Sequence, residues 1–143
     1  MRKLKIKEIL IEGNKLLKDN HIEEETIICK LLLKYLLNKD NSFLVIHQDE
    51  EIDEVVQEQF FEFIDEIIQG RPIQYIVKNQ EFMGLDFYVD ENVLIPQPDT
   101  EVLVLKTVDI CKSFKNSKKL KILDLCTGSG AIAIALAKIL QEE

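Results

Sequence analysis

Hydrophobic residues in the first half of the chain recur at helical spacing. Apolar side chains fall three or four positions apart, with charged residues between them. Asn20, followed by Glu23 three residues later, is a candidate N-cap and capping box, and Asp49 is a second candidate cap. The pattern predicts a helical bundle over residues 1–70. Its expected helices cover residues 4–18, 21–37, 42–47 and 49–69.

The hydrophobic period changes at Gly70. A glycine there can end a helix, and Pro72 prevents the helix from continuing. Residues 80–89 alternate around Met83 and Gly84, which is typical of two short strands joined by a tight turn. Residues 71–92 are therefore predicted to form a linker and a β-hairpin.

A proline-stiffened segment follows the hairpin. Pro96 and Pro98 lie two residues apart and restrict the backbone. Asp99 or Thr100 can cap a helix that runs to about residue 114. That helix is apolar on most of its sides, so we expect it to lie between two layers.

A short apolar run, residues 120–125, is typical of a buried strand. Gly128 and Gly130 follow it, and residues 131–140 form an apolar helical stretch. A strand, a glycine turn and a helix are the start of a Rossmann-like unit, to which we assign residues 93–143. The predicted fold is a mainly α N-terminal helical bundle, then a β-hairpin and the truncated start of an α/β Rossmann-like domain.

The glycine turn restricts the kind of ligand. Gly128 and Gly130 match the first two glycines of a dinucleotide loop, and Ala133 is an allowed residue at the third position. The loop lacks the lysine of a phosphate-binding loop. Asp124 at the strand end would repel a pyrophosphate but suits a cationic or hydroxyl-bearing ligand, such as the amino-acid part of S-adenosylmethionine. The simpler interpretation is a strand–turn–helix with a capping aspartate and no ligand.

The net charge of −8 is concentrated in the helical half. Residues 1–70 hold 9 Lys and Arg against 16 Asp and Glu. Nucleic acid is therefore not expected as a direct partner of this half. No apolar run reaches the roughly 18 residues that a membrane span needs. Three distant cysteines and two histidines favour reduced thiols over a disulfide framework or a metal site, so we expect a cytoplasmic protein.

Four segments resemble the HemK-type protein-glutamine methyltransferases, which modify peptide-chain release factors. They are Gly-Arg-Pro-Ile-Gln-Tyr-Ile from Gly70, Glu-Phe-Met-Gly-Leu from Glu81, Leu-Ile-Pro-Gln-Pro-Asp-Thr-Glu from Leu94 and Ile-Leu-Asp-Leu-Cys-Thr-Gly-Ser-Gly-Ala-Ile from Ile122. Two residues depart from the family pattern: Gln97 stands where arginine is usual, and Cys126 where glycine is common.

The resemblance implies a Rossmann-like methyltransferase domain after the helical bundle. It also implies methyl transfer from S-adenosylmethionine to a glutamine side-chain amide in the Gly-Gly-Gln loop of a release factor, with the bundle helping to hold that protein. The glycine loop would line the methionine part of the cofactor, Asp124 would orient its amino group, and the proline segment would shape the nearby wall. The implied cofactor residues are Pro96, Asp99, Thr100, Glu101, Asp124, Cys126, Thr127, Gly128, Ser129 and Gly130.

The family's Asn-Pro-Pro-Tyr motif, which would hold the substrate amide, does not occur in the sequence, and only 13 residues follow Gly130. We therefore expect a fragment of a longer enzyme that is inactive alone, with no catalytic residue of its own. Its unpaired strand and last helix would pack against the bundle or against another copy of the chain. Two alternatives remain open: a non-enzymatic helical interaction module, and a same-fold methyltransferase with another protein or nucleic-acid substrate. A nicotinamide enzyme is disfavoured by Asp124.

Overall fold

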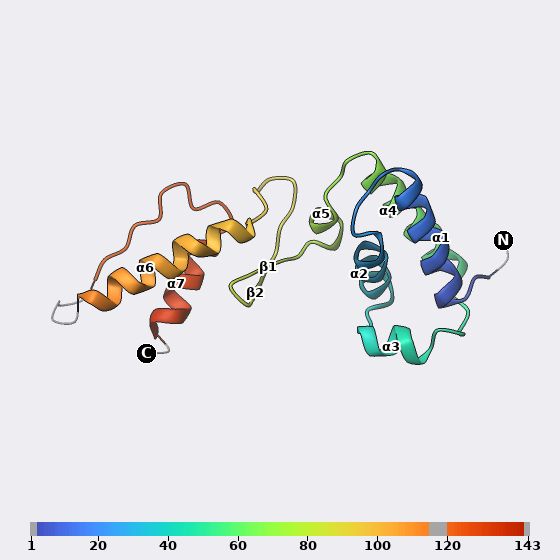
Figure 1. Cartoon of the computed structure of the whole chain (residues 1–143), viewed down its shortest axis with the longest axis horizontal. Helices are drawn as coiled ribbons and strands as arrows, with labels where there is room; N and C mark the ends of the chain where they lie inside the picture. The colour runs from blue at the N-terminus through green and yellow to red at the C-terminus, as the bar shows by residue number, and fades with distance from the viewer. Residues whose placement is uncertain (1–2, 115–119, 142–143) are drawn as a thin grey trace. The chain divides into compact units, whose positions relative to one another are not determined.

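The computed structural model describes residues 3–114 and 120–141. The chain divides into two compact units, Met1–Val77 and Lys78–Glu143. Figure 1 shows the helices and strands of each unit. Within the described ranges, no helix is long and apolar enough to cross a membrane.

The first unit, here called the helical unit, is a bundle, as the hydrophobic pattern predicts. Its first, second and fourth helices pack against one another, and the fifth packs against the second. One continuous apolar core joins them, with Leu17, Leu32 and Phe60 fully buried. The helices are α1 (Ile6–Asp19), α2 (Glu25–Leu37), α3 (Asn41–Ile46), α4 (Glu54–Ile68) and α5 (Ile73–Val77).

Two of the predicted helix caps are wrong. Asn20 is the C-cap of α1, where its side-chain amide donates to the Leu16 carbonyl at 2.9 Å. Helix α2 begins only at Glu25, after Glu24 in the left-handed conformation. Helix α4 is capped by Asp53, whose carboxylate accepts from the backbone N–H of residue 55 at 2.9 Å.

Helix α4 starts late because the residues before it pair with the start of α1. The Ile52 N–H donates to the Leu4 carbonyl at 2.9 Å, and the Ile6 N–H donates to the Glu50 carbonyl at 3.0 Å. Those backbone groups are therefore satisfied outside the helix. Asp49, the expected cap, instead forms an ion pair with Lys7 at 2.5 Å.

The end of α4 agrees with the prediction. Gly70 has a φ of +96°, and its N–H donates to the Ile67 carbonyl at 2.9 Å. The Arg71 N–H donates to the Glu66 carbonyl at 3.0 Å. These two bonds form a Schellman motif, which requires a left-handed residue after the helix and so favours glycine.

The second unit contains the predicted hairpin and two helices. Strands β1 (Gln80–Phe82) and β2 (Leu85–Phe87) are antiparallel, with Phe82 opposite Leu85. A short 3₁₀ turn, η1 (Pro98–Thr100), leads into α6 (Glu101–Ser113), and α7 (Ala131–Gln141) packs against α6. The buried core of this unit comprises Phe82, Phe87, Val104, Val108, Ala131, Ala135 and Leu136.

The Rossmann-like start is not confirmed. Residues 120–125, expected to be a strand, have no regular secondary structure. A strand needs a neighbour that accepts and donates its ladder hydrogen bonds, and in the described part of this unit only β1 and β2 are paired. The fold shown by the structure is mostly helical with one two-stranded hairpin.

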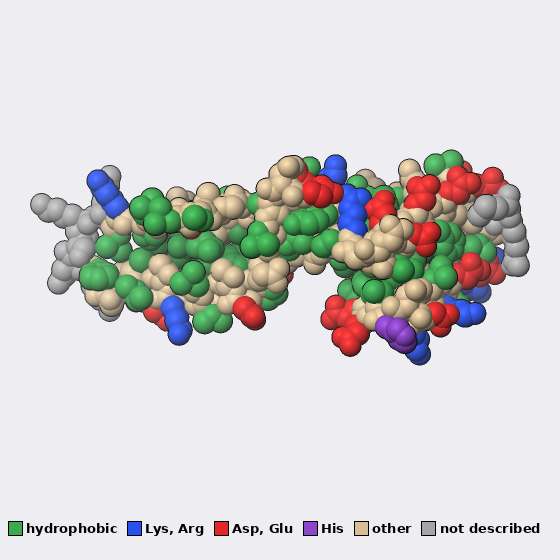
Figure 2. Space-filling view, turned by 90° about the horizontal axis from the view of Figure 1, so that it is seen from above, with side chains coloured by type: hydrophobic (Ala, Val, Ile, Leu, Met, Phe, Trp, Pro, Cys, Tyr) green, Lys and Arg blue, Asp and Glu red, His purple; other side chains and the backbone are tan. Residues whose placement is uncertain are grey.

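Helix α6 also differs from its prediction, because one face packs against α7 while the other is uncovered. Val102, Leu105 and Ile110 are each more than half exposed. Figure 2 shows hydrophobic side chains gathered along this unit, whereas acidic side chains are spread over the visible face of the helical unit. The expected self-association through this surface stays a prediction.

Candidate cofactor site

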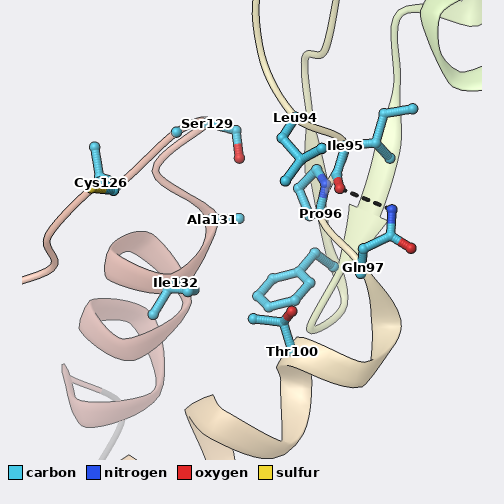
Figure 3. A pocket seen from close by; sticks show the side chains of 12 residues that line it. Leu94, Ile95, Pro96, Gln97, Thr100, Cys126, Ser129, Ala131 and Ile132 are labelled. Atoms are coloured by element: carbon cyan, nitrogen blue, oxygen red, sulfur yellow. Dashed lines mark hydrogen bonds between the residues drawn. The ribbon is translucent and has the colours of Figure 1, made fainter.

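A cavity of about 200 Å³ lies within the second unit, between the proline segment and the glycine loop. Figure 3 shows the two segments on opposite sides of it, with the start of α7 beneath the glycine loop. The motifs lie far apart in the sequence, but the fold brings them together. The lining residues are Phe82, Leu94, Ile95, Pro96, Gln97, Thr100, Cys126, Thr127, Gly128, Ser129, Ala131 and Ile132.

The glycine loop is held in its shape by left-handed backbone conformations. Gly128 has a φ of +57° and Gly130 a φ of +79°. The Gly130 N–H donates to the Thr127 carbonyl at 2.9 Å, which closes the turn, and the Gly130 carbonyl accepts the first bond of α7. Ala131 and Ile132, the first two residues of α7, line the cavity, and the N–H groups of a first helical turn have no partner within their own helix.

Cys126 shares this left-handed conformation, with a φ of +60°. An L-residue with a side chain pays about 1 kcal/mol for that geometry, whereas glycine does not. The family's usual glycine at this position therefore suits the conformation better than the cysteine of this chain. The Cys126 side chain is exposed and lies on the cavity lining.

Asp124 does not line the cavity. Its carboxylate accepts a hydrogen bond from the Thr127 hydroxyl at 2.8 Å. It borders a separate hollow between Leu120, Ile122 and one face of α7. Asp124 therefore reaches the cavity only through Thr127, whose side chain it orients.

The proline segment lines the side of the cavity opposite the glycine loop. The Gln97 amide donates to the Ile95 carbonyl at 3.1 Å, so this side chain is turned back onto its own loop (Figure 3). The Thr100 N–H donates to the Gln97 carbonyl at 3.0 Å and begins the turn into α6. Where the family's arginine would place a charge, this wall is neutral.

Glu101 and Asp99 lie outside the lining. The Glu101 carboxylate accepts the Met83 N–H at 2.8 Å, which ties the start of α6 to the hairpin turn. This contact holds β1 beside the cavity, where Phe82, only 1% exposed, forms part of the wall. Asp99 is exposed on η1.

The structure thus brings together six of the ten sequence-predicted residues: Pro96, Thr100, Cys126, Thr127, Gly128 and Ser129. Asp99, Glu101, Asp124 and Gly130 are not among the lining residues. The cavity is also lined by six residues that were not predicted from the sequence: Phe82, Leu94, Ile95, Gln97, Ala131 and Ile132. All but Phe82 are immediate neighbours of the two motifs, which was the available signal.

The lining fits part of a nucleoside-containing cofactor. Sites for such ligands commonly measure about 300–1,000 Å³, so a cavity of about 200 Å³ accommodates one portion of the molecule. Hydroxyls of Thr100, Thr127 and Ser129 and backbone N–H groups are available to a polar amino-acid portion, and the remaining wall is apolar. Among the described residues, no group of three or more His, Cys, Asp and Glu side chains could hold a metal ion.

Comparisons with a family model and with known proteins indicate the same family. Residues 8–77 match the model of the PrmC N-terminal domain. A release factor glutamine methyltransferase of Clostridium acetobutylicum is 42% identical over 135 residues, which are 94% of this chain and 46% of that protein. Proteins of the same name are 40% identical in Clostridium botulinum, over 92% of this chain and 45% of that protein, and 40% identical in Haemophilus influenzae, over 85% and 42%.

The chain spans about half the length of the curated relatives it matches. The match extends beyond the helical unit, because the alignment covers 94% of the chain while the domain model ends at residue 77. Residues 8–77 therefore resemble the PrmC N-terminal domain, and the chain as a whole resembles the N-terminal portion of the HemK-type release factor glutamine methyltransferases.

Proposed function

We propose that this chain supplies part of the S-adenosylmethionine site of a protein-(glutamine-N5) methyltransferase that acts on peptide-chain release factors in the cytoplasm. The observation that carries the proposal is the shared cavity: the proline segment and the glycine loop line the same space from opposite sides (Figure 3). The relatives, which are release factor glutamine methyltransferases, support the same reaction.

The residues of the chain have separate tasks in this proposal. Backbone N–H groups of Gly128 and Ser129 bind the carboxylate of the cofactor's methionine part, since both residues line the cavity next to the start of α7. Thr127, oriented by Asp124, and Thr100 offer hydroxyls to the same part. Pro96 and its neighbours form the apolar side.

The cofactor, when bound, supplies a methyl group on a sulfonium for transfer to the glutamine amide nitrogen. The chain contains no Asn-Pro-Pro-Tyr motif to hold that amide. We therefore propose that the chain contributes to cofactor binding and that methyl transfer requires further residues.

Calorimetric titration of the full chain with S-adenosylmethionine, with NAD as the control ligand, tests the proposal. Saturable binding of S-adenosylmethionine alone is the expected result. Gly128→Val should weaken it at least tenfold, because the new side chain enters the cavity lining. Gly84→Val is the matched control: it also has a positive φ, of +72°, but a Cβ there meets nothing within 4 Å and lies outside the cavity.

Three results would overturn the proposal: no saturable binding of S-adenosylmethionine, equal binding of NAD, or an equal loss in both glycine variants. Circular dichroism of each variant separates a binding defect from unfolding.

A second candidate function is a non-enzymatic helical interaction module. It is favoured by the independent match of residues 8–77 to a family model. The discriminating result is a chain that binds a release factor in fluorescence anisotropy but shows no affinity for S-adenosylmethionine. Binding of both molecules supports the methyltransferase proposal.

A further inference from the structure

A trough on the helical unit combines an apolar floor with a basic rim. It consists of two adjoining hollows of about 290 and 250 Å³, which share Lys30 and Asn41 as lining residues. The first lies where α1, α2 and α3 meet, over Leu10 and Leu44, and the second runs along α2 beside Ile27. We call the two hollows together the α2 trough.

The floor of the α2 trough exposes apolar side chains that the core does not use. Ile27 is 55% exposed, Leu31 38% and Val45 69%. Ile27 and Leu31 are one helical turn apart and so form a ridge along α2. This surface can accept apolar side chains from a partner without any change in the core.

The rim carries two lysines with the same spacing as the apolar ridge. Lys30 and Lys34 are also one turn apart on α2, so their ammonium groups form a row parallel to the apolar ridge. Lys7 stands on the α1 side but is already paired with Asp49 at 2.5 Å. Within the part of the chain that the structure describes, neither Lys30 nor Lys34 forms an ion pair.

This positive row stands out against the charge of its surroundings. Residues 1–70 hold 9 basic and 16 acidic side chains, a balance of −7. A partner that covers only the trough meets lysines, whereas a partner that spreads over the whole unit meets excess negative charge. The charge distribution therefore favours a narrow anionic partner over an anionic membrane surface.

We propose that the α2 trough docks an acidic amphipathic helix of a protein partner. Apolar residues spaced i, i+3, i+4 and i+7 on that helix pack along Ile27 and Leu31. Carboxylates beside them pair with Lys30 and Lys34. The inference does not depend on the cofactor cavity, which belongs to the other unit of the chain.

The test uses a dye-labelled synthetic helix of about four turns, with leucine at i, i+3, i+4 and i+7 and glutamate beside each leucine. Its binding to the full chain is followed by fluorescence anisotropy. The matched control peptide replaces every glutamate with lysine. We expect saturable binding of the acidic peptide only, weakening as the Debye length falls with added salt.

The double variant Lys30→Glu with Lys34→Glu reverses the charge of the rim. It should lower the affinity for the acidic peptide about tenfold. Lys15→Glu with Lys18→Glu is the control for the same change in net charge, because both residues are exposed on α1 and line neither hollow. That control should bind within about twofold of the unchanged chain. Val45→Asp should weaken binding through the floor while leaving the rim intact.

Equal binding of the basic peptide, no binding of either peptide, or an equal effect of the two double variants would overturn the inference. Vesicles that contain phosphatidylserine provide the remaining test. Membrane binding that is lost in the Lys30 and Lys34 variant would assign the trough to a lipid surface and also overturn it.

Discussion

The most informative stability test concerns Gly13 in the middle of α1. Helix propensity alone says that alanine should improve this position by about 1 kcal/mol, since glycine is a poor helix former. The structure says otherwise, because a Cβ at this position would lie 2.8 Å from the Phe60 ring and 2.9 Å from the Cys29 sulfur. Both neighbours are fully buried.

The magnitude follows from these distances. Non-bonded carbon atoms approach to about 3.5–4.0 Å, so the Phe60 ring on α4 or the backbone of α1 must move by more than half an ångström to admit the methyl group. Overpacking of a close-packed core costs about 1–3 kcal/mol. After the gain in propensity of about 1 kcal/mol, Gly13→Ala should lower the free energy of unfolding by about 1 kcal/mol.

Urea unfolding of the full chain, followed by circular dichroism at the helical minimum, measures this change. Lys15→Ala on the exposed side of α1 is the control for a change to alanine without new contacts, and it should be nearly neutral. Phe60→Leu in combination with Gly13→Ala tests the mechanism. With a smaller neighbour, the alanine should become neutral or stabilising, and the pair should couple by about 1 kcal/mol or more.

A Gly13→Ala variant that is more stable than the unchanged chain would refute the reasoning, because propensity would then outweigh the contact. Destabilisation that persists unchanged in the Phe60→Leu background would also refute it, since the clash with the ring would not be the cause.

Three further predictions concern other residues. Burial, with a smaller contribution from the charge of Glu25, raises the pKa of the Cys29 thiol from 9.0 to about 12. The folded state therefore binds this proton more tightly than the unfolded state, so stability present below about pH 9 should fall as pH rises towards 12. Urea midpoints measured from pH 8 upward should fall more for the unchanged chain than for Cys29→Ala. Gln57→Leu should lower the free energy of unfolding by about 1–3 kcal/mol, because the buried amide donates to the Ile52 carbonyl at 2.8 Å and accepts from a backbone N–H at 3.3 Å; an unchanged urea midpoint would contradict this. Cys126→Gly should raise the melting temperature by calorimetry, since it relieves a left-handed conformation that costs about 1 kcal/mol, and a lower melting temperature would count against the strain.

Much of the local structure could be predicted from the sequence. Hydrophobic residues at helical spacing predict α1, α2 and α4, because the apolar face of an amphipathic helix must be buried whichever element it packs against. Gly70 ends α4, and Met83 with Gly84 turns the hairpin, because these events depend on backbone conformations over a few residues. The motifs of the glycine loop and the proline segment also pointed to the family that the comparisons support.

The cavity was only partly predictable. Thr127, Gly128 and Ser129 could be named from their motif, but Phe82 lines the cavity only because a contact between Glu101 and the hairpin turn holds β1 there. Asp124 was the residue that favoured S-adenosylmethionine over a dinucleotide as the ligand of the glycine loop. In the structure it accepts a hydrogen bond from Thr127 and does not line the cavity.

The sequence by itself determined most of the helices, the end of α4 at Gly70 and which family the chain resembles, because those depend on short-range periodicity and on motif order. It did not predict α5, which lies in the expected linker and belongs to a first unit that extends to Val77. Only the tertiary structure decided where α4 begins, why a side chain at Gly13 is unfavourable and whether residues 120–125 form a strand. Each of these depends on a partner far away in the chain: the start of α1, the Phe60 ring, and a neighbouring strand that is not found among the described residues.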